Sequence, residues 1–321
     1  FGVKSMKIVS LKRLGEIEAS LINSYPDLEF YFFKKAVDIP TELKNELEIL
    51  IGYDSGVDKN FINACPNLKW ISWYATGVNN LPLEVIKERN IILTNTRGIQ
   101  AKQVSEFVLS FILNDYKKMR TSYVNQVNKV YDSKLTGKRL SDEKVLILGT
   151  GSLAQQTVKL LKPFELEIIG ISKSGHHKDG FDNIYTIEDL ESHLNKADII
   201  INTLPETQET YHLLSERHFK IMNDKCLFIN VGRGTIVEEK ILIKVLNHNL
   251  IRHAYLDVFE NEPLDANNEL YKLDNVTITA HITGNDKNIK SDATKLFERN
   301  LNDFLNKNDV IENRVDLYKG Y

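Results

Sequence analysis

The stretch 144–154, KVLILGTGSLA, places a mostly apolar run directly before a G-x-G-x-x-A turn. The apolar run predicts a buried strand, and the residues after the turn predict a helix. In such a turn Gly149 permits the tight bend, whereas Gly151 lets the backbone approach a ligand closely. A helix that begins at Ser152 and Leu153 points its N-terminus at that ligand and favours negative charge. The stretch therefore predicts a site for the pyrophosphate of a dinucleotide.

The end of the next predicted strand, 166–171, indicates which dinucleotide binds. An NAD site usually carries Asp or Glu at this point, where the carboxylate accepts hydrogen bonds from the ribose hydroxyls. This chain has Ser172, Lys173 and Ser174 instead. Two hydroxyls and an ammonium group suit a 2′-phosphate, which a carboxylate would repel. We therefore expect NADP(H) to be preferred, with NAD(H) as a possible cofactor.

Short apolar runs alternate with polar, helix-like stretches along most of the chain, which predicts parallel sheets covered by helices. The predicted strands are 7–10, 28–33, 48–51, 69–74, 91–94, 145–148, 166–171, 198–203, 226–231, 253–257 and 276–279. Residues 101–131 contain no Pro or Gly and show helical spacing, so they predict one or two long helices between two domains. The sequence predicts an α/β fold.

The composition narrows the class of protein. With 321 residues the chain is long enough for two domains, and its net charge of -3 argues against a nucleic-acid partner. No apolar stretch is long enough to span a membrane, and no signal peptide is visible. The two cysteines, Cys65 and Cys226, fit a reducing compartment, so we expect a cytoplasmic protein. No cluster of ligands predicts a metal site.

Four further segments place polar residues directly after predicted strands, where open α/β sheets bind ligands. They are 202–210 (NTLPETQET), 228–238 (FINVGRGTIVE), 256–264 (LDVFENEPL) and 279–284 (TAHITG). Together with the glycine turn, and in this order, they resemble the D-isomer-specific 2-hydroxyacid dehydrogenase family, in particular its glyoxylate/hydroxypyruvate reductase-like branch. The resemblance covers about residues 69–284.

The resemblance implies two doubly wound parallel-sheet domains with substrate bound in the cleft between them. A Rossmann cofactor domain would span residues 99–285, and a flavodoxin-like substrate domain would combine 1–98 with 286–321. It also implies the reaction, which is hydride transfer between a nicotinamide cofactor and a small D-2-hydroxy acid or 2-keto acid. Members of the family usually dimerise through the cofactor domain, so we expect a homodimer.

The family pattern implies a role for each matching residue. Arg233 would grip the substrate carboxylate with its planar fork. His281 would give a proton to the keto oxygen during reduction, and Glu262 would hold the histidine in the required tautomer. In the first domain, the backbone of Thr76 and Gly77 would hold the substrate carboxylate. The residues implied near the nicotinamide and its ribose are Leu204, Pro205, Thr210, Val231, Gly232 and Asp257.

Some features leave alternatives open. Gln100 stands where the family often has histidine, and Trp73 and Tyr74 fit either the substrate pocket or the domain core. A regulatory protein that senses nicotinamide cofactors with the same fold is the chief alternative function. An amino-acid dehydrogenase is a second one, although it requires an ammonia-handling lysine and aspartate that we cannot locate in the sequence.

Overall fold

The computed structural model describes residues 5–11 and 14–318. The chain divides into two compact units. Unit 1 consists of residues Phe1–Ile99 and Asp286–Tyr321, and unit 2 consists of residues Gln100–Asn285. The predicted substrate domain includes residues 1–4, 12–13 and 319–321, which lie outside the described part of the chain. Both units are α/β, as the alternation of apolar and helical segments predicted.

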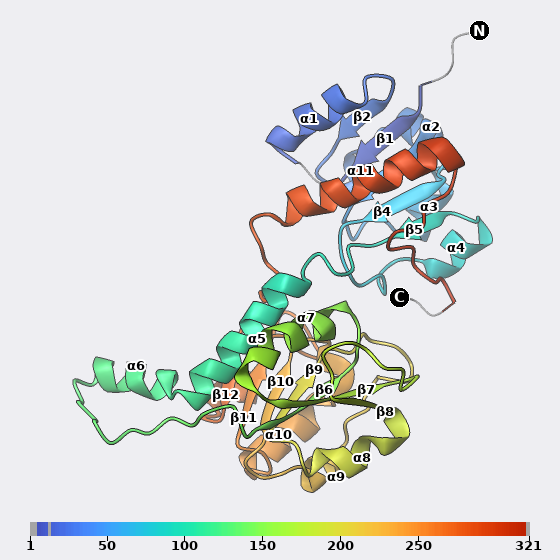
Figure 1. The fold of residues 1–321 in the computed structure, drawn as a ribbon. Helices are drawn as coiled ribbons and strands as arrows, with labels where there is room; N and C mark the ends of the chain where they lie inside the picture. Colours follow the sequence, from blue (N-terminus) through green and yellow to red (C-terminus); the bar gives the residue numbers. More distant parts are fainter. Residues whose placement is uncertain (1–4, 12–13, 319–321) are drawn as a thin grey trace. The chain divides into compact units, whose positions relative to one another are not determined.

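Unit 1 contains a five-stranded parallel sheet with the strand order β2-β1-β3-β4-β5 (Figure 1). This order is the flavodoxin-like one, in which the chain first moves to one edge of the sheet and then crosses to the other. The strands are β1 (Lys7–Ser10), β2 (Glu29–Phe32), β3 (Leu47–Gly52), β4 (Trp70–Trp73) and β5 (Ile92–Thr94). The helices are α1 (Glu16–Ser24), α2 (Thr41–Glu46), α3 (Lys59–Asn63), α4 (Leu83–Glu88) and α11 (Ile289–Lys307).

The long helix α11 comes from the C-terminal segment and packs on the sheet of unit 1. The indole of Trp70 in β4 lies 5.2 Å from the ring centroid of Phe297 and 5.5 Å from that of Phe304. Trp73 is buried, and the Tyr74 hydroxyl lies 3.1 Å from Thr294 Oγ1 on α11. Trp73, the last residue of β4, and Tyr74, which follows it, therefore belong to the core of unit 1.

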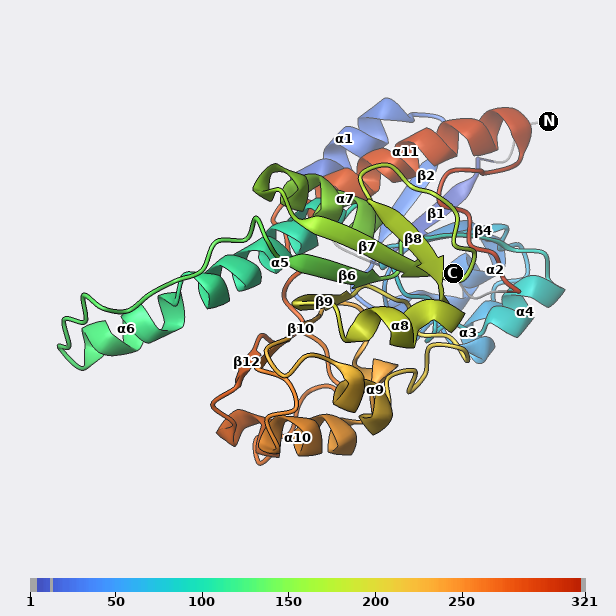
Figure 2. The ribbon, with the colours of Figure 1, turned by 60° about the horizontal axis from the view of Figure 1, so that its bottom comes forward.

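Unit 2 contains a seven-stranded parallel sheet with the order β12-β11-β10-β9-β6-β7-β8 (Figure 2). The order of strands reverses between β6 and β9, and ligands of open α/β sheets bind at such a switch point, beyond the carboxyl ends of the strands. The strands are β6 (Lys144–Leu148), β7 (Glu167–Ser172), β8 (Asn183–Thr186), β9 (Ile199–Asn202), β10 (Leu227–Asn230), β11 (His253–Leu256) and β12 (Val276–Ile278).

The helices of unit 2 cover this sheet, except for one that extends away from it. They are α5 (Ala101–Tyr116), α6 (Met119–Val127), α7 (Ser152–Leu161), α8 (Leu190–Leu194), α9 (Glu216–Ile221) and α10 (Glu239–Asn247). Helix α6 and the segment after it project from the body of unit 2 as an arm (Figures 1 and 2). None of the nine residues of α6 is buried.

The helical stretch predicted for 101–131 forms two helices, which the left-handed backbone of Lys118 separates, and one or two were expected. Its predicted end was wrong, because residues 128–131 are not helical. Strand β8 was missed because its four residues lie at the edge of the sheet and none of them is buried, which leaves no apolar run in the sequence. No helix in the described ranges is long and apolar enough to cross a membrane.

Candidate active site

The glycine turn lies between β6 and α7, at the switch point of the unit 2 sheet. Gly149 has a φ of 99°, and a Cβ there would lie 2.6 Å from Thr203 Oγ1, so only glycine fits the bend. A Cβ on Gly151 would meet no atom within 4 Å, so the space in front of this residue is open. No side chain caps the start of α7, where Ser152 is exposed. These backbone N–H groups fit the pyrophosphate of a dinucleotide.

The loop after β7 carries the three polar residues expected to select the cofactor. Ser172 Oγ accepts a hydrogen bond of 3.0 Å from the backbone N–H of Gly175 and retains its own hydroxyl proton for donation. Ser174 is exposed. Lys173 Nζ lies 2.7 Å from Glu209 Oε1, and both side chains are mostly exposed. The loop therefore presents hydroxyl groups and a lysine whose charge is partly balanced by Glu209.

Two buried asparagines connect the cofactor-lining loops. Asn202 and Asn230 end neighbouring strands, and Asn202 Nδ2 donates to Asn230 Oδ1 over 2.9 Å. The backbone N–H of Leu204 donates to Asn202 Oδ1, and the N–H of Gly232 donates to Asn230 Oδ1. A Cβ on Gly232 would lie 2.7 Å from the Leu204 carbonyl oxygen, so the two loops touch there. Sequence reasoning did not assign a role to this asparagine pair.

The other predicted residues of these loops hold the local backbone. Thr210 Oγ1 donates to the Pro205 carbonyl oxygen over 2.6 Å and accepts from the N–H of Thr207 over 2.8 Å. Val231 is buried directly after β10. The loop from Leu204 to Thr210 is thus closed on itself and rests against the end of β10.

Arg233 lies in a narrow turn between two glycines. Its carbonyl oxygen accepts a hydrogen bond of 3.1 Å from Asn230 Nδ2, and its Nη1 donates to the Gly232 carbonyl oxygen over 2.8 Å. A Cβ on Gly234 would lie 1.9 Å from the carbonyl carbon of Phe259, so this turn presses against the loop after β11. Burial lowers the pKa of Arg233, while the carboxylates of Glu206 and Glu262 act in the opposite direction. The guanidinium remains a cation at neutral pH.

His281 and Glu262 form a hydrogen-bonded pair. His281 Nδ1 lies 2.7 Å from Glu262 Oε2, and Glu262 Oε1 accepts from the backbone N–H of Phe259 over 2.9 Å. Because an ionised carboxylate can only accept, Nδ1 carries a hydrogen and Nε2 is the atom left for proton exchange. The His281 side chain is 52% exposed, so that nitrogen is accessible. The pair can deliver a proton to an oxygen atom or remove one from it.

Asp257, which the family resemblance places near the nicotinamide carboxamide, is bonded to the loop that carries His281. Its side chain is fully buried, and Oδ1 accepts from Thr279 Oγ1 over 2.6 Å and from the N–H of Ile282 over 2.9 Å. Oδ2 accepts from the hydroxyl of Thr283 over 2.6 Å and from its N–H over 3.2 Å. The Asp257 carbonyl oxygen also accepts from the N–H of His281. Asp257 thus fixes the loop that carries His281.

Gln100 holds the far end of the same loop. Its Nε2 donates to the Gly284 carbonyl oxygen over 3.2 Å, and a Cβ on Gly284 would lie 2.9 Å from this amide. Gln103, one turn further along α5, donates to the Asn285 carbonyl oxygen over 3.3 Å. The loop from Thr279 to Asn285 is therefore fixed at both ends by side chains of unit 2.

Thr76 and Gly77 belong to unit 1, in the loop after β4. The carbonyl oxygen of Thr76 accepts from Asn95 Nδ2 over 2.9 Å, and that of Ala75 accepts from the N–H of Thr96 over 3.2 Å. Asn95 and Thr96 are buried after β5, whereas Thr76 is exposed. Asn95 and Thr96 thus fix one side of the loop, and Thr76 lies on its solvent-exposed side.

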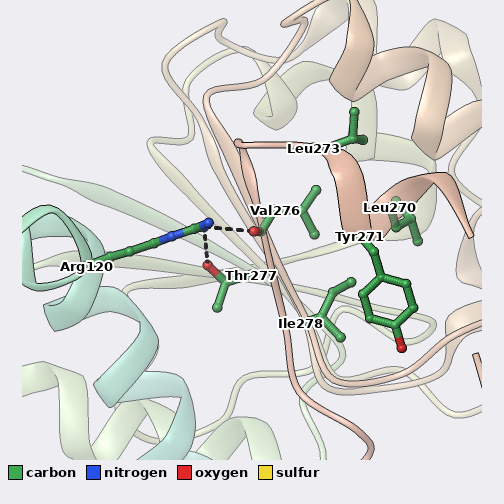
Figure 3. A pocket seen from close by; sticks show the side chains of 7 residues that line it. All are labelled: Arg120, Leu270, Tyr271, Leu273, Val276, Thr277 and Ile278. Carbon is green, nitrogen blue, oxygen red and sulfur yellow. Dashed lines mark hydrogen bonds between the residues drawn. The ribbon is translucent and has the colours of Figure 1, made fainter. Parts of the chain in front are cut away.

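A cavity of about 220 Å³ lies elsewhere on unit 2 and contains none of the predicted site residues (Figure 3). Arg120 of α6 reaches across to β12, where Nη1 donates to the Val276 carbonyl oxygen over 2.9 Å. The remaining lining comes from the short helix Glu269–Lys272, from the residue after it and from β12: Leu270, Tyr271, Leu273, Thr277 and Ile278. No group of three or more His, Cys, Asp or Glu in the described ranges could hold a metal ion.

Comparisons with known proteins agree on one family. Residues 109–283 match the model of the D-isomer specific 2-hydroxyacid dehydrogenase NAD binding domain. A glyoxylate reductase of Thermofilum pendens is 32% identical over 252 residues, which cover 76% of this chain and 74% of that protein. A glyoxylate reductase of Pyrococcus horikoshii is 27% identical over 92% of this chain and 91% of its own length.

A solved structure resembles the whole chain. It is a D-isomer specific 2-hydroxyacid dehydrogenase family protein from Aeromonas salmonicida, which superposes with a TM-score of 0.87 at 28% identity. The match covers 98% of this chain and all of that one. The similarity therefore extends over both units.

Proposed function

Because this chain belongs to the D-isomer specific 2-hydroxyacid dehydrogenase family, we propose that it reduces glyoxylate, hydroxypyruvate or a similarly small 2-keto acid. It is a nicotinamide-dependent oxidoreductase that transfers hydride between its cofactor and a 2-hydroxy or 2-keto acid. The observation that carries the proposal is the His281–Glu262 pair. The loop that contains Glu262 contacts the Arg233 turn, where Phe259 lies against Gly234. A purely regulatory role is not favoured, because the relatives are reductases.

The residues of unit 2 have different roles in the proposed reduction. The bound nicotinamide supplies the hydride. Arg233 binds the substrate carboxylate with a charged fork that is planar and therefore sets the direction of the keto group. His281 donates the proton on Nε2 to the keto oxygen, and Glu262 keeps Nδ1 protonated so that Nε2 points outward.

Each unit has a further binding role in this proposal. Unit 2 binds the cofactor through the backbone at Gly151 and Ser152 and through the loop from Leu204 to Thr210, for which the open space at Gly151 is the support. Unit 1 binds the substrate carboxylate through the backbone of Thr76 and Gly77, for which the outward-facing loop after β4 is the support.

NADP(H) is the preferred cofactor in this proposal. The support is chemical: no carboxylate follows β7, and the loop offers two hydroxyls and the exposed Lys173 to a 2′-phosphate. Glu209 weakens this preference because its carboxylate balances the charge of Lys173. Asp257 contributes through the loop of His281, since its carboxylate is occupied by that loop.

Steady-state kinetics with both cofactors test this preference. We expect a lower KM for NADPH than for NADH, and Ser172→Asp should reverse the order because its carboxylate would repel the phosphate. Glu209→Gln should lower the KM for NADPH further and leave that for NADH unchanged, because it removes the competing carboxylate. Lys178→Gln, at another exposed lysine after β7, is the control. Equal KM values that no variant separates would contradict the preference.

The chain forms a homodimer through the arm of unit 2 in this proposal. The arm exposes Tyr123, Val124, Val127, Val130 and Tyr131, whose exposed fractions range from 47% to 96%. A nine-residue helix without a buried side chain gains little stability from its own hydrogen bonds, which favours a covering surface.

A cytoplasmic location is also part of this proposal. Its support is that the free thiols of Cys65 and Cys226 are buried, which fits a reducing compartment.

A panel of 2-keto acids with NADPH tests the proposed reaction. The absorbance of the reduced cofactor should fall with glyoxylate or hydroxypyruvate, and the product should be the D-isomer wherever the product is chiral. Larger branched keto acids serve as the comparison. Cofactor binding without turnover on any keto acid would contradict the proposal and would favour the regulatory alternative.

A further inference from the structure

The loop after β11 carries two glutamates, and each of them holds a histidine. Glu262 Oε2 lies 2.7 Å from His281 Nδ1, and Glu260 Oε1 lies 2.7 Å from His212 Nε2. Both histidines have a left-handed backbone, with φ values of 52° and 51°. His281 belongs to the proposed reaction, whereas His212 and Glu260 have no part in the roles described above.

His212 is held firmly from several sides. Its backbone N–H donates to the Thr235 carbonyl oxygen over 2.7 Å, in the segment that follows Arg233. The ring of Tyr211 stacks on the imidazole with a centroid distance of 4.0 Å. The His212 side chain is 31% exposed, so its position is set by these contacts rather than by solvent. Because a carboxylate only accepts, Nε2 donates to Glu260.

Glu260 uses its second oxygen on another element. Oε2 accepts from the backbone N–H of Glu239, the first residue of α10, over 2.9 Å. A carboxylate at this position also benefits from the positive end of the helix dipole. Glu260 is therefore bound on one side to α10 and on the other to His212, and its side chain is 20% exposed.

These contacts connect the cofactor side of the site to the acid–base side. His212 lies two residues after Thr210, the last residue of the cofactor-lining loop that begins at Leu204. Glu260 precedes Glu262 by two residues, and between β11 and the short helix Glu269–Lys272 this segment forms no helix or strand. The bonds of Glu260 to His212 and to α10 are therefore contacts that fasten the loop of Glu262.

We propose that His212 and Glu260 are a positioning pair, which holds the Glu262 loop so that Glu262 keeps His281 oriented for proton transfer. This inference rests on the proposed role of His281. A loosened loop would let the Glu262 carboxylate move away from Nδ1, so that fewer molecules hold the reactive geometry. The pair itself exchanges no proton with the substrate.

The test compares three variants of the full-length protein in the reductive direction. His212→Ala should lower kcat about tenfold or more and leave the KM for the keto acid nearly unchanged, because the imidazole of His281 is less often oriented for proton transfer while Arg233 still binds the carboxylate. His212→Gln should restore most of kcat, since its amide nitrogen can donate to Glu260 as Nε2 does. Glu260→Gln should behave like a milder form of His212→Ala.

His218→Ala is the matched control. His218 lies six residues further along the same segment and completes the capping box of α9 with Ser215, so its loss reduces stability without reaching the Glu262 loop. A lowered melting temperature with an unchanged kcat is expected for this control. The same result for His212→Ala, or no rescue by His212→Gln, would overturn the positioning role.

The outcomes separate this inference from the proposed function. If the unaltered protein reduces 2-keto acids and His281→Ala does not, the proposed function stands, and the His212 variants then decide the role of the pair. If the unaltered protein reduces none of them, the proposed function fails first. If His212→Ala does not fold, His212→Gln and Glu260→Gln still give the comparison of kcat with KM.

Discussion

Asp257, Asn202 and Asn230 are polar residues that the fold buries almost completely, and each has hydrogen-bond partners. A buried carboxylate or amide is costly without partners, so its presence at a strand end requires the surrounding loops to supply them. In this protein the loops that supply them are those of His281, Leu204 and Arg233. The buried polar residues therefore determine where the exposed ones point.

His281 is the residue whose loss should affect the chemistry most directly. We expect His281→Ala to lower kcat by roughly 10² to 10⁴ with little change in the dissociation constant of NADPH, because proton donation is lost while the cofactor loops remain. The matched control is His248→Ala, which changes an exposed histidine after α10. Stopped-flow turnover and fluorescence titration measure the two quantities. Near-normal turnover by His281→Ala would remove this residue from the mechanism.

For individual residues, the sequence identified the candidate site residues better than it identified their contacts. Arg233, Glu262 and His281 were named from motifs, and the structure pairs the last two at 2.7 Å. The asparagine pair and the His212–Glu260 pair were missed, because neither residue of either pair is near the other in sequence. Only the register of parallel strands and the course of the loops bring such residues together.

Strands and helices were predicted closely wherever they are buried. The predicted strand 145–148 lies within β6, and 253–257 contains β11, since continuous apolar runs are typical of strands covered on both faces. Strand β8 was missed and the stretch 128–131 was wrongly taken as helical. Both lie where tertiary packing is weak, so local sequence carries little information about their structure.

Strand β11 contains a histidine that should make stability depend on pH. Burial lowers the pKa of His253 to about 4 from an ordinary value of 6.5, and its Nε2 lies 2.9 Å from Thr277 Oγ1 in β12. Between these two pH values the unfolded chain binds the proton more readily than the folded one. The free energy of unfolding should therefore fall as the pH decreases through this window, and His253 should have no effect above it.

The variant His253→Gln tests this dependence, because its amide can retain a bond to Thr277 but takes up no proton. From about pH 7 to pH 5, the unaltered protein should lose roughly 1 to 2 kcal/mol more stability than the variant, after allowance for partial exposure. Urea denaturation at both pH values measures the difference, with His248→Gln as the control. Equal losses in all three proteins would show that His253 is not held neutral.

At the scale of the whole molecule, the exposed arm should govern assembly. We expect a homodimer at micromolar concentration, and the double variant Val124→Glu, Val127→Glu should be monomeric, because charges would replace the apolar surface. The melting temperature of the monomeric variant should be lower than that of the dimer only by the stabilisation that assembly provides. Sedimentation velocity measures the state, and Ile311→Glu, on an exposed residue of unit 1, is the control. A monomeric unaltered protein would contradict the dimer.

The interrupted course of unit 1 has a consequence for how the protein is made on the ribosome. The last strand of its sheet ends at Thr94, but α11, which covers Trp70, begins only at Ile289, about 195 residues later. At about 5 to 20 residues per second, that interval lasts roughly 10 to 40 seconds. Unit 2 is continuous and can complete its own core meanwhile. During this interval the apolar face that α11 will cover stays exposed on the nascent N-terminal segment, and such transiently exposed surface promotes aggregation.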